Sequence, residues 1–125
     1  MKIIIAGSRG ITSANLVYQA IEQSGFKFDE VVSGGAAGVD ELGEDWAETS
    51  NIPVKVFPAN WYKHGKAAGP LRNQTMACYA DALVAVWDGE SLGTYNMILE
   101  MQYRNKPVKV FLVDENKLNE LKASI

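Results

Sequence analysis

The sequence predicts an α/β protein: a single Rossmann-like, three-layer domain with a five-stranded parallel sheet and helices on both faces. Five short apolar runs alternate along the chain with segments whose apolar residues recur at helical spacing. This alternation favours parallel strands joined by right-handed crossovers through helices. A length of 125 residues with 47% hydrophobic residues suits one core. We therefore expect residues 1–125 to form one domain.

The first half of the chain is expected to form three strands with two helices between them. Apolar runs at Lys2–Ala6, Glu30–Ser33 and Val54–Phe57 predict the strands. Helical spacing predicts helices from Thr12 to about Ser24 and over Gly38–Ser50. The first helix has hydroxyl side chains at its start, suited to capping, and a glycine just after its end.

The second half of the chain continues the alternation after a polar and aromatic segment. In chain order, the sequence predicts a loop at Ala59–Ala68, a helix from Pro70 to about Tyr79, a strand at Ala82–Trp87, a helix at Leu92–Arg104, a strand at Val108–Val113 and a short closing helix at Asn116–Ala123. The whole pattern is a strand followed by a helix, repeated five times.

Composition excludes several classes of protein. The chain has 12 Lys and Arg against 15 Asp and Glu, and its net charge of −3 argues against nucleic-acid binding through phosphate neutralisation. The single cysteine, Cys78, forms no intrachain disulfide and is expected to be a small buried side chain. No apolar run approaches the ~20 residues that span a bilayer, so no membrane association is expected. No Cys and His residues have zinc-ligand spacing, so no metal site is expected.

The chemistry is expected in the loops after the strands, because ligands of open parallel sheets bind beyond the carboxyl ends of the strands. Glycine lets such a loop approach a ligand closely, and the first N–H groups of the helix that follows favour an anion. Arg9, Lys66 and Arg72 add positive charge. These features predict a cradle for a phosphate or a nucleotide. Most glycines of the chain lie in four of these loops, at residues 7–10, 33–40, 60–73 and 88–94.

Three common motifs fit poorly. The phosphate-binding P-loop fails because Gly65-Lys66 lacks a following Ser or Thr. The dinucleotide fingerprint fails at residues 34–38, so NAD is not supported. The segment Gly89–Gly93 matches the nucleophile elbow of hydrolases, but His64 lies upstream of its serine, whereas that fold places the histidine downstream.

Aromatic residues are expected in or beside the site. Trp61, Tyr62 and Trp87 follow the third strand or end the fourth, and an aromatic face can stack on a nucleobase. Core packing is an equal alternative for Trp87. The sequence assigns no role to Trp61, Tyr62 or His64 beyond this.

Four segments together resemble a known family. They resemble the YspA-like, YpsA-related branch of the SLOG superfamily, which is similar to LOG phosphoribohydrolases, molybdenum-cofactor carrier proteins and the DNA-processing protein DprA. The resemblance runs from residue 3 to about residue 113 and implies a Rossmann-like, nucleotide-binding domain that commonly forms homodimers or higher homo-oligomers. Members occur in bacteria and phages, so the implied location is the cytoplasm, or the host cytoplasm for a phage protein. The matching segments are Gly7–Arg9, Ser33–Asp40, Trp61 with Gly65–Met76, and Trp87–Thr94.

The resemblance also implies roles for individual residues. The loop glycines and hydroxyls would contact sugar or phosphate, Arg72 and Asn73 would hold the phosphate or the glycosidic region, and Asp40 would cap N–H groups or bind a ribose. With Lys66 and Trp87 added from their place in the loops, the candidate ligand-binding residues are Gly7, Ser8, Arg9, Ser33, Gly34, Gly35, Gly38, Asp40, Lys66, Arg72, Asn73, Trp87, Gly89, Ser91, Gly93 and Thr94.

One departure from the LOG enzymes bears on catalysis. Their Pro-Gly-Gly-x-Gly-Thr-x-x-Glu motif supplies a glutamate that works with an arginine in N-glycosidic cleavage. Met97 stands where that glutamate would fall, which argues against LOG-type hydrolysis, because such cleavage benefits from a nearby carboxylate. The catalytic residues are therefore unknown, with Asp88, Glu90 and Arg72 as candidates.

Three functions remain in competition. The leading one is binding of a small nucleotide or nucleotide-derived ligand by a sensor, carrier or sequestering protein, with no cofactor assigned beyond that ligand. The second is a nucleotide-processing hydrolase that cleaves a glycosidic or phosphate bond, with Asp88 or Glu90 as acid or base. The third is a non-catalytic module that binds a partner protein or single-stranded nucleic acid. A local basic patch would serve that third function, formed by Lys63, His64, Lys66 and Arg72.

Overall fold

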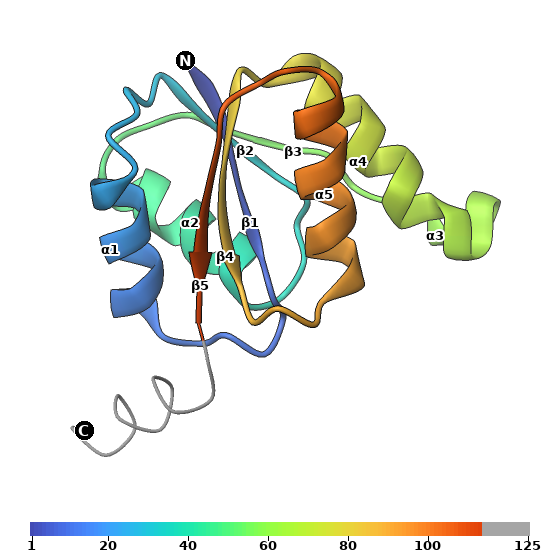
Figure 1. The fold of residues 1–125 in the computed structure, drawn as a ribbon, viewed down its shortest axis with the longest axis horizontal. Coiled ribbons are helices and arrows are strands. Elements are labelled where there is room, and N and C mark those ends of the chain that lie inside the picture. The colour runs from blue at the N-terminus through green and yellow to red at the C-terminus, as the bar shows by residue number, and fades with distance from the viewer. Residues whose placement is uncertain (114–125) are drawn as a thin grey trace.

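The five predicted strands form one parallel sheet with the order β3-β2-β1-β4-β5 in a computed structural model that describes residues 1–113 (Figure 1). This confirms the predicted fold class, an α/β domain of Rossmann-like architecture. The predicted closing helix Asn116–Ala123 lies outside the described residues. The strands are β1 (Lys2–Gly7), β2 (Glu30–Ser33), β3 (Val54–Val56), β4 (Ala82–Trp87) and β5 (Val108–Leu112).

Helices cover both faces of this sheet and give it two cores. Helices α1 (Ala14–Gln23) and α2 (Val39–Thr49) lie on one face, and α4 (Ala68–Tyr79) and α5 (Leu92–Tyr103) lie on the other (Figure 1). Successive residues of β1 point to opposite faces, so Ile3 and Ile5 enter the first core while Ile4 and Ala6 enter the second. A central parallel strand is therefore apolar along its whole length, which is why its run was recognisable in the sequence.

The helices of the first layer begin and end within two residues of the predicted positions. The Ser13 side chain caps α1 by accepting a hydrogen bond from the Leu16 N–H, and Gly25 follows the helix with a φ of 73°. In α2, a Cβ at Gly43 would lie 2.6 Å from the Ile5 side chain. Glycine there lets the helix approach β1 closely.

Within residues 1–113, every helix is too short or too polar to cross a lipid bilayer.

The prediction of a loop at Ala59–Ala68 is wrong, because most of this segment is helical. It forms α3 (Trp61–His64) and a 3₁₀ turn, η1 (Gly65–Ala67), and leads directly into α4. The Asn60 side chain accepts a hydrogen bond from the Lys63 N–H at 3.0 Å and so caps α3. None of the α3 residues is buried. The segment therefore lacks the apolar stripe by which a helix is recognised in a sequence, and it projects from the side of the domain (Figure 1).

Cys78 is exposed rather than buried. The buried side chains of α4 include Asn73, Met76 and Ala77, and Cys78 lies beside that stripe on the helix surface. The expectation of a buried thiol is therefore wrong.

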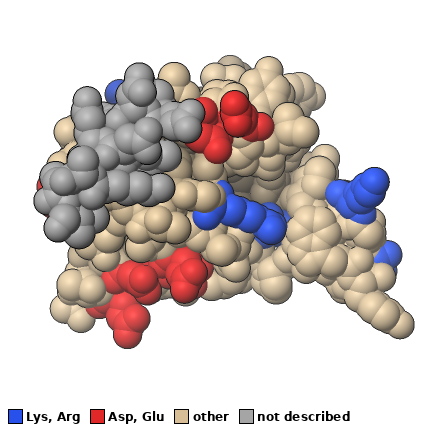
Figure 2. Space-filling model, turned by 90° about the horizontal axis from the view of Figure 1, so that it is seen from below, with Lys and Arg blue, Asp and Glu red and all other residues tan. Residues whose placement is uncertain are grey.

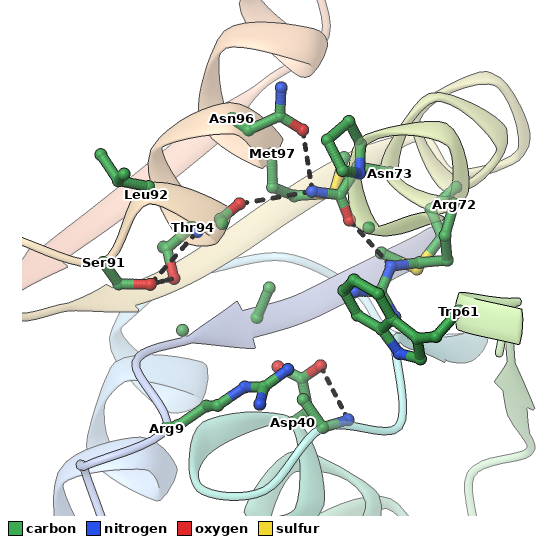
Figure 3. Close-up of a pocket in the computed structure, with 17 residues that line it drawn as sticks. Arg9, Asp40, Trp61, Arg72, Asn73, Ser91, Leu92, Thr94, Asn96 and Met97 are labelled. Atoms are coloured by element: carbon green, nitrogen blue, oxygen red, sulfur yellow. Dashed lines mark hydrogen bonds between the residues drawn. The ribbon is translucent and has the colours of Figure 1, made fainter. Parts of the chain in front are cut away.

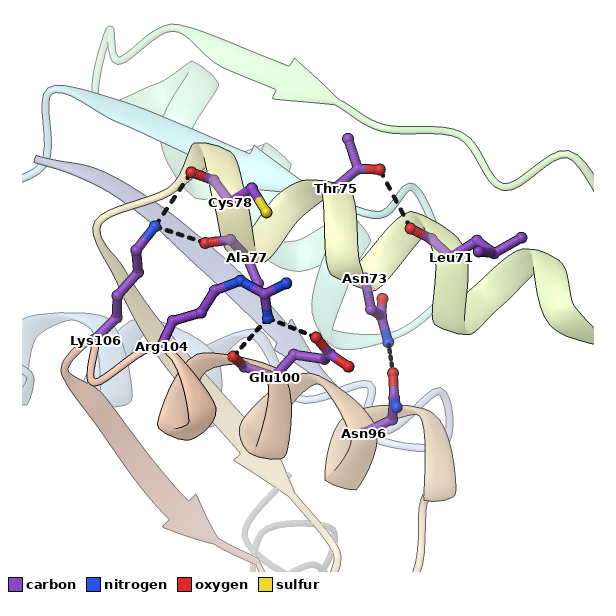
Figure 4. A network of polar contacts seen from close by, with 9 residues as sticks. All are labelled: Leu71, Asn73, Thr75, Ala77, Cys78, Asn96, Glu100, Arg104 and Lys106. Carbon is purple, nitrogen blue, oxygen red and sulfur yellow. Dashed lines mark hydrogen bonds and ion pairs between the residues drawn. The ribbon is translucent and has the colours of Figure 1, made fainter.

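A lysine from the loop before β5 caps the end of α4 (Figure 4). Lys106 Nζ donates hydrogen bonds to the carbonyl oxygens of Ala77 at 2.7 Å, Cys78 at 3.2 Å and Ala80 at 2.7 Å. These carbonyls include the last ones of the helix, which lack partners within it and carry the negative end of the helix dipole.

Replacing Lys106 by methionine is expected to lower the free energy of unfolding by about 1–2 kcal/mol, because partly buried carbonyls lose a charged donor. Urea denaturation would measure this loss. The matched control is Lys109→Met, which removes the same charge from an exposed position of β5. Equal stability of the two variants would contradict the capping role.

Candidate functional site

The candidate site lies at the point in the sheet where the strand order reverses. From β1 the chain passes to β2 and β3 on one side, and β4 and β5 follow on the other side of β1. The carboxyl ends of β1 and β4 therefore border a crevice, the usual ligand position in open α/β sheets. Figure 2 views the molecule from below, onto the edge where the strands end, and shows Lys and Arg side chains at the centre of a hollow with Asp and Glu clusters to either side.

Two neighbouring cavities occupy this edge. The first, of about 300 Å³, lies between the end of β1, α4 and the start of α5 (Figure 3). The second, of about 410 Å³, lies between the glycine-rich loop after β2 and the segment after β3. The four residues that line both cavities are Arg9, Ala36, Trp61 and Arg72.

The loop after β1 is held tightly against β4. A Cβ at Gly7 would lie 2.0 Å from the carbonyl oxygen of Val86, so only glycine fits. The Ser8 N–H donates to the same oxygen at 3.1 Å, and the Ser8 hydroxyl accepts a hydrogen bond from the Asp88 N–H at 3.0 Å. Ser8 thus joins two loops beneath the site, and Arg9 is the side chain of this loop that reaches both cavities.

The glycine-rich loop after β2 is fixed by hydrogen bonds that the sequence did not indicate. The buried Ser33 hydroxyl donates to Glu44 Oε2 at 2.7 Å and accepts from the Gly35 N–H at 3.1 Å. Its one donor and one of its two acceptor positions are therefore used within the protein. Gly38 has a φ of 78°, and a Cβ there would lie 2.5 Å from the backbone oxygen of Arg9. This glycine lets the two loops pack against each other.

Asp40 is a buried carboxylate that lines the first cavity. The residue is 6% exposed, and its Oδ2 accepts a hydrogen bond from the Ala36 N–H at 3.3 Å. Burial raises the pKa of Asp40 to about 6, although the Ala36 N–H and the positive charge of Arg72 both oppose the rise. The carboxylate therefore supports the glycine-rich loop while it faces the cavity, and it titrates close to neutral pH.

Arg72 crosses from α4 to the glycine-rich loop. Its Nη1 donates to the Gly34 carbonyl oxygen at 2.6 Å, and its Nε donates to Asn73 Oδ1 at 2.9 Å. Burial lowers the pKa of Arg72, the charge of Asp40 opposes that shift, and the nearby positive charge of Arg9 adds to it. Among residues 1–113, neither Arg9 nor Arg72 forms an ion pair with a carboxylate. The two guanidinium groups therefore create local positive potential at the boundary of the two cavities.

Asn73 ties this arginine to α5. Its Nδ2 donates to Asn96 Oδ1 at 2.9 Å and to the Gly93 carbonyl oxygen at 3.3 Å (Figures 3 and 4). Asn73 thereby orients Arg72 and fixes the start of α5. Asn96 and Glu44 could not be recognised as supporting residues in the sequence, because their partners lie 23 and 11 positions away in the chain.

The loop after β4 contains both candidate acids, and neither of them lines the cavities. Asp88 Oδ1 accepts hydrogen bonds from the N–H groups of Glu90 at 2.8 Å and Ser91 at 2.9 Å. Partial burial alone would raise the pKa of Asp88, but these hydrogen bonds lower it below its ordinary value. Asp88 therefore organises its own loop. Ser91 caps α5, and Ser91, Gly93 and Thr94 all line the first cavity.

The three candidate aromatic residues have different environments. Trp61 is 52% exposed and lines both cavities. Trp87 donates from Nε1 to the Ser91 carbonyl oxygen at 3.0 Å and stacks on Tyr95 with ring centroids 5.8 Å apart. It thus packs beside the loop rather than lining a cavity. Tyr62 is fully exposed on α3, and His64 is exposed on the same helix.

Some predicted ligand-binding residues lie around the cavities rather than in their walls. Ser8, Ser33 and Gly38 support the loops, and Lys66 is exposed on η1. In the predicted basic patch, Lys63, His64 and Lys66 are exposed, whereas Arg72 is partly buried in the site. The residues in the walls of the first cavity that were predicted to bind ligand are Gly7, Arg9, Asp40, Arg72, Asn73, Ser91, Gly93 and Thr94.

Comparison with known proteins identifies the family. The sequence profile of the YspA, cpYpsA-related SLOG family matches residues 1–64, which is more than half of the chain and includes the loops after β1 and β2. The chain belongs to this family. Membership suggests nucleotide-related ligand binding or processing.

A protein of a bacteriophage is similar to this chain along most of its length. "Gene 61 protein" of Mycobacterium phage D29 is 34% identical over 116 residues, covering 86% of this chain and 93% of the phage protein. No solved structure gives a significant match.

Proposed function

We propose that the chain binds a small nucleotide or nucleotide-derived ligand at the carboxyl edge of its sheet, as a sensor, carrier or sequestering protein. The observation that carries this proposal is the meeting of Arg9, Arg72 and Trp61 around one cleft. Two cations that form no ion pair within residues 1–113 suit a phosphate, and an exposed indole beside them suits a base.

Arg9 and Arg72 can bind a phosphate while the contacts that support the fold stay in place. Arg72 is already oriented by Gly34 and Asn73, so little side-chain entropy is lost when it binds. Arg9 is exposed, and its guanidinium has no hydrogen-bond partner among the described residues. Charge-assisted hydrogen bonds from two guanidinium groups are the strongest recognition that this cleft offers.

The described geometry favours binding over the hydrolase alternative. Asp88 and Glu90 lie outside the cavity walls, and Met97, where LOG enzymes carry glutamate, is buried. Asp40 is the carboxylate that lines the first cavity. The hydrolase role of Asp88 or Glu90 remains a prediction, and turnover of a bound nucleotide that disappears in Glu90→Gln would support it.

Isothermal titration calorimetry tests the proposal directly. Nucleoside monophosphates, diphosphates and cyclic nucleotides would be titrated into the purified protein, and heat is expected with at least one class. No binding of any of them would overturn the proposed function.

Replacing Arg9 by glutamine is expected to weaken the binding of such a nucleotide by about tenfold or more, since one charge-assisted contact is lost. Because Arg9 makes no hydrogen bond within residues 1–113, the melting temperature should stay unchanged. Lys109→Gln, which removes the same charge far from the site on β5, is the control. Unchanged affinity in Arg9→Gln would show that the phosphate does not lie at this arginine.

Homodimer or higher homo-oligomer formation remains a prediction. The surface best suited to it within residues 1–113 is one exposed apolar stripe along α5, formed by Leu92, Tyr95, Leu99 and Tyr103. Native mass spectrometry of the freshly purified protein would report the subunit number and any retained ligand together.

A further inference from the structure

We propose that the ligand has two ends joined by a diphosphate: a nucleoside diphosphate that carries a second sugar on its distal phosphate. This inference rests on the proposed function, because it specifies the class of nucleotide that the same cleft binds. It comes from the division of the cleft into two cavities and from the position of the cations between them.

The cations lie at the boundary of the two cavities. Arg9 and Arg72 line both, and Arg9 lowers the pKa of Arg72, as expected for two neighbouring positive groups. A ligand with a terminal phosphate would need the cations of the protein at the far end of a single cavity. Cations at a central boundary instead suit an anion in the middle of the ligand.

The two cavities differ in their chemistry. The first has apolar side chains from α4 and α5 together with hydroxyl and amide groups, a combination that suits a nucleoside. Its apolar residues include Ala6, Pro70, Met76, Leu92 and Met97.

The second cavity is lined by Gly and Ala residues and by the larger side chains of Arg9, Val56, Pro58, Trp61 and Arg72. Gly34, Gly35 and Ala37 form one side, and Val56 and Pro58 lie on the other. The Gly34 carbonyl and the N–H groups of Gly35 and Ala36 already have partners within the protein, so this cavity suits a sugar by its size and by the guanidinium groups at its boundary with the first cavity. With about 410 Å³, the cavity is within the usual range of small-molecule sites.

Trp61 and Ala36 also face both cavities. Figure 3 shows the indole of Trp61 beside Arg72, with Arg9 entering from the opposite side of the cleft. The two guanidinium groups would hold the diphosphate of a two-ended ligand, and the Trp61 indole would lie against the base at the end of the nucleoside next to them.

The test compares matched pairs of ligands by calorimetry: ADP with ADP-ribose, GDP with GDP-mannose, and UDP with UDP-glucose. Each sugar-linked member carries less negative charge than its diphosphate partner. In the pair that binds best, we expect the sugar-linked member to bind about tenfold tighter, because it alone fills the second cavity.

Variants that narrow one cavity at a time distinguish the contributions of the two ends of the ligand to binding. Ala37→Leu narrows the second cavity at an exposed position, and it should weaken the sugar-linked ligand by about tenfold while leaving the plain diphosphate unchanged. Gly93→Leu narrows the first cavity, where a Cβ meets no atom within 4 Å, and it should weaken both. Circular dichroism and melting temperature would confirm that both variants are folded.

Two results would overturn the inference. One is a plain diphosphate that binds at least as tightly as its sugar-linked partner in the best pair. The other is an equal loss for both ligands in Ala37→Leu. Either result leaves the proposed nucleotide binding intact. The absence of binding by all six ligands would also overturn the inference, and the proposed function would fall with it only if monophosphates and cyclic nucleotides did not bind either.

Discussion

Gly7→Ala is expected to unfold the protein or to lower its free energy of unfolding by about 3 kcal/mol or more, at the upper end of overpacking effects. The added Cβ would lie 2.0 Å from the carbonyl oxygen of Val86 and 2.7 Å from Val39 Cγ2. The first of these atoms belongs to the backbone of β4, in register with β1, so it cannot move without disturbing the sheet. Urea denaturation monitored by circular dichroism would measure the loss.

Gly10→Ala is the matched control for this prediction. It lies in the same loop, and a Cβ there meets no atom within 4 Å. Its stability should stay within about 0.5 kcal/mol of the parent protein. If Gly7→Ala were as stable as Gly10→Ala, the close packing between the ends of β1 and β4 would not exist as described.

Asp40→Asn is expected to stabilise the protein at pH 7 and to have little effect near pH 4. The pKa of Asp40 is about 6 in the folded protein, against 3.8 for an unperturbed side chain. Between these values the folded protein binds more protons than the unfolded chain, so its free energy of unfolding falls as the pH rises. The full fall corresponds to about 3 kcal/mol, and asparagine removes it because it stays neutral.

The measurement is the free energy of unfolding of both proteins from pH 4 to pH 8. The difference between them should grow between about pH 4 and pH 6 and then become constant. Asp45→Asn makes the same charge change at an exposed position of the same helix and serves as the control. A difference that does not depend on pH would contradict the raised pKa of Asp40.

The fold could be predicted from the sequence because its signals are local. Apolar runs marked the strands to within one or two residues, and the cap at Ser13 and the glycine at 25 marked the ends of α1. The prediction failed at residues 59–68, where helix formation depends on a cap at Asn60 and on no apolar stripe. A short exposed helix leaves too weak a pattern to be separated from a polar loop.

The site could be predicted only as a set of loops. The carboxyl ends of parallel strands share one edge, so their positions along the chain already placed the loops together. The sequence could not tell which polar side chains line the cavities and which support the loops. Ser33 and Asp88 were predicted in functional roles, yet their side chains are engaged in hydrogen bonds within the protein.

The sequence by itself determined the α/β class, the strand and helix order and the sheet edge on which the candidate site is proposed, since each depends on periodicity or turn chemistry within a few residues. Tertiary structure alone decided the partners of the polar groups. The Ser8 hydroxyl meets the Asp88 N–H across 80 positions of the chain, and Arg72 meets the Gly34 carbonyl across 38. Such contacts depend on how distant loops pack together. That packing places Arg9 and Arg72 between two cavities and leaves Asp40 buried beside them.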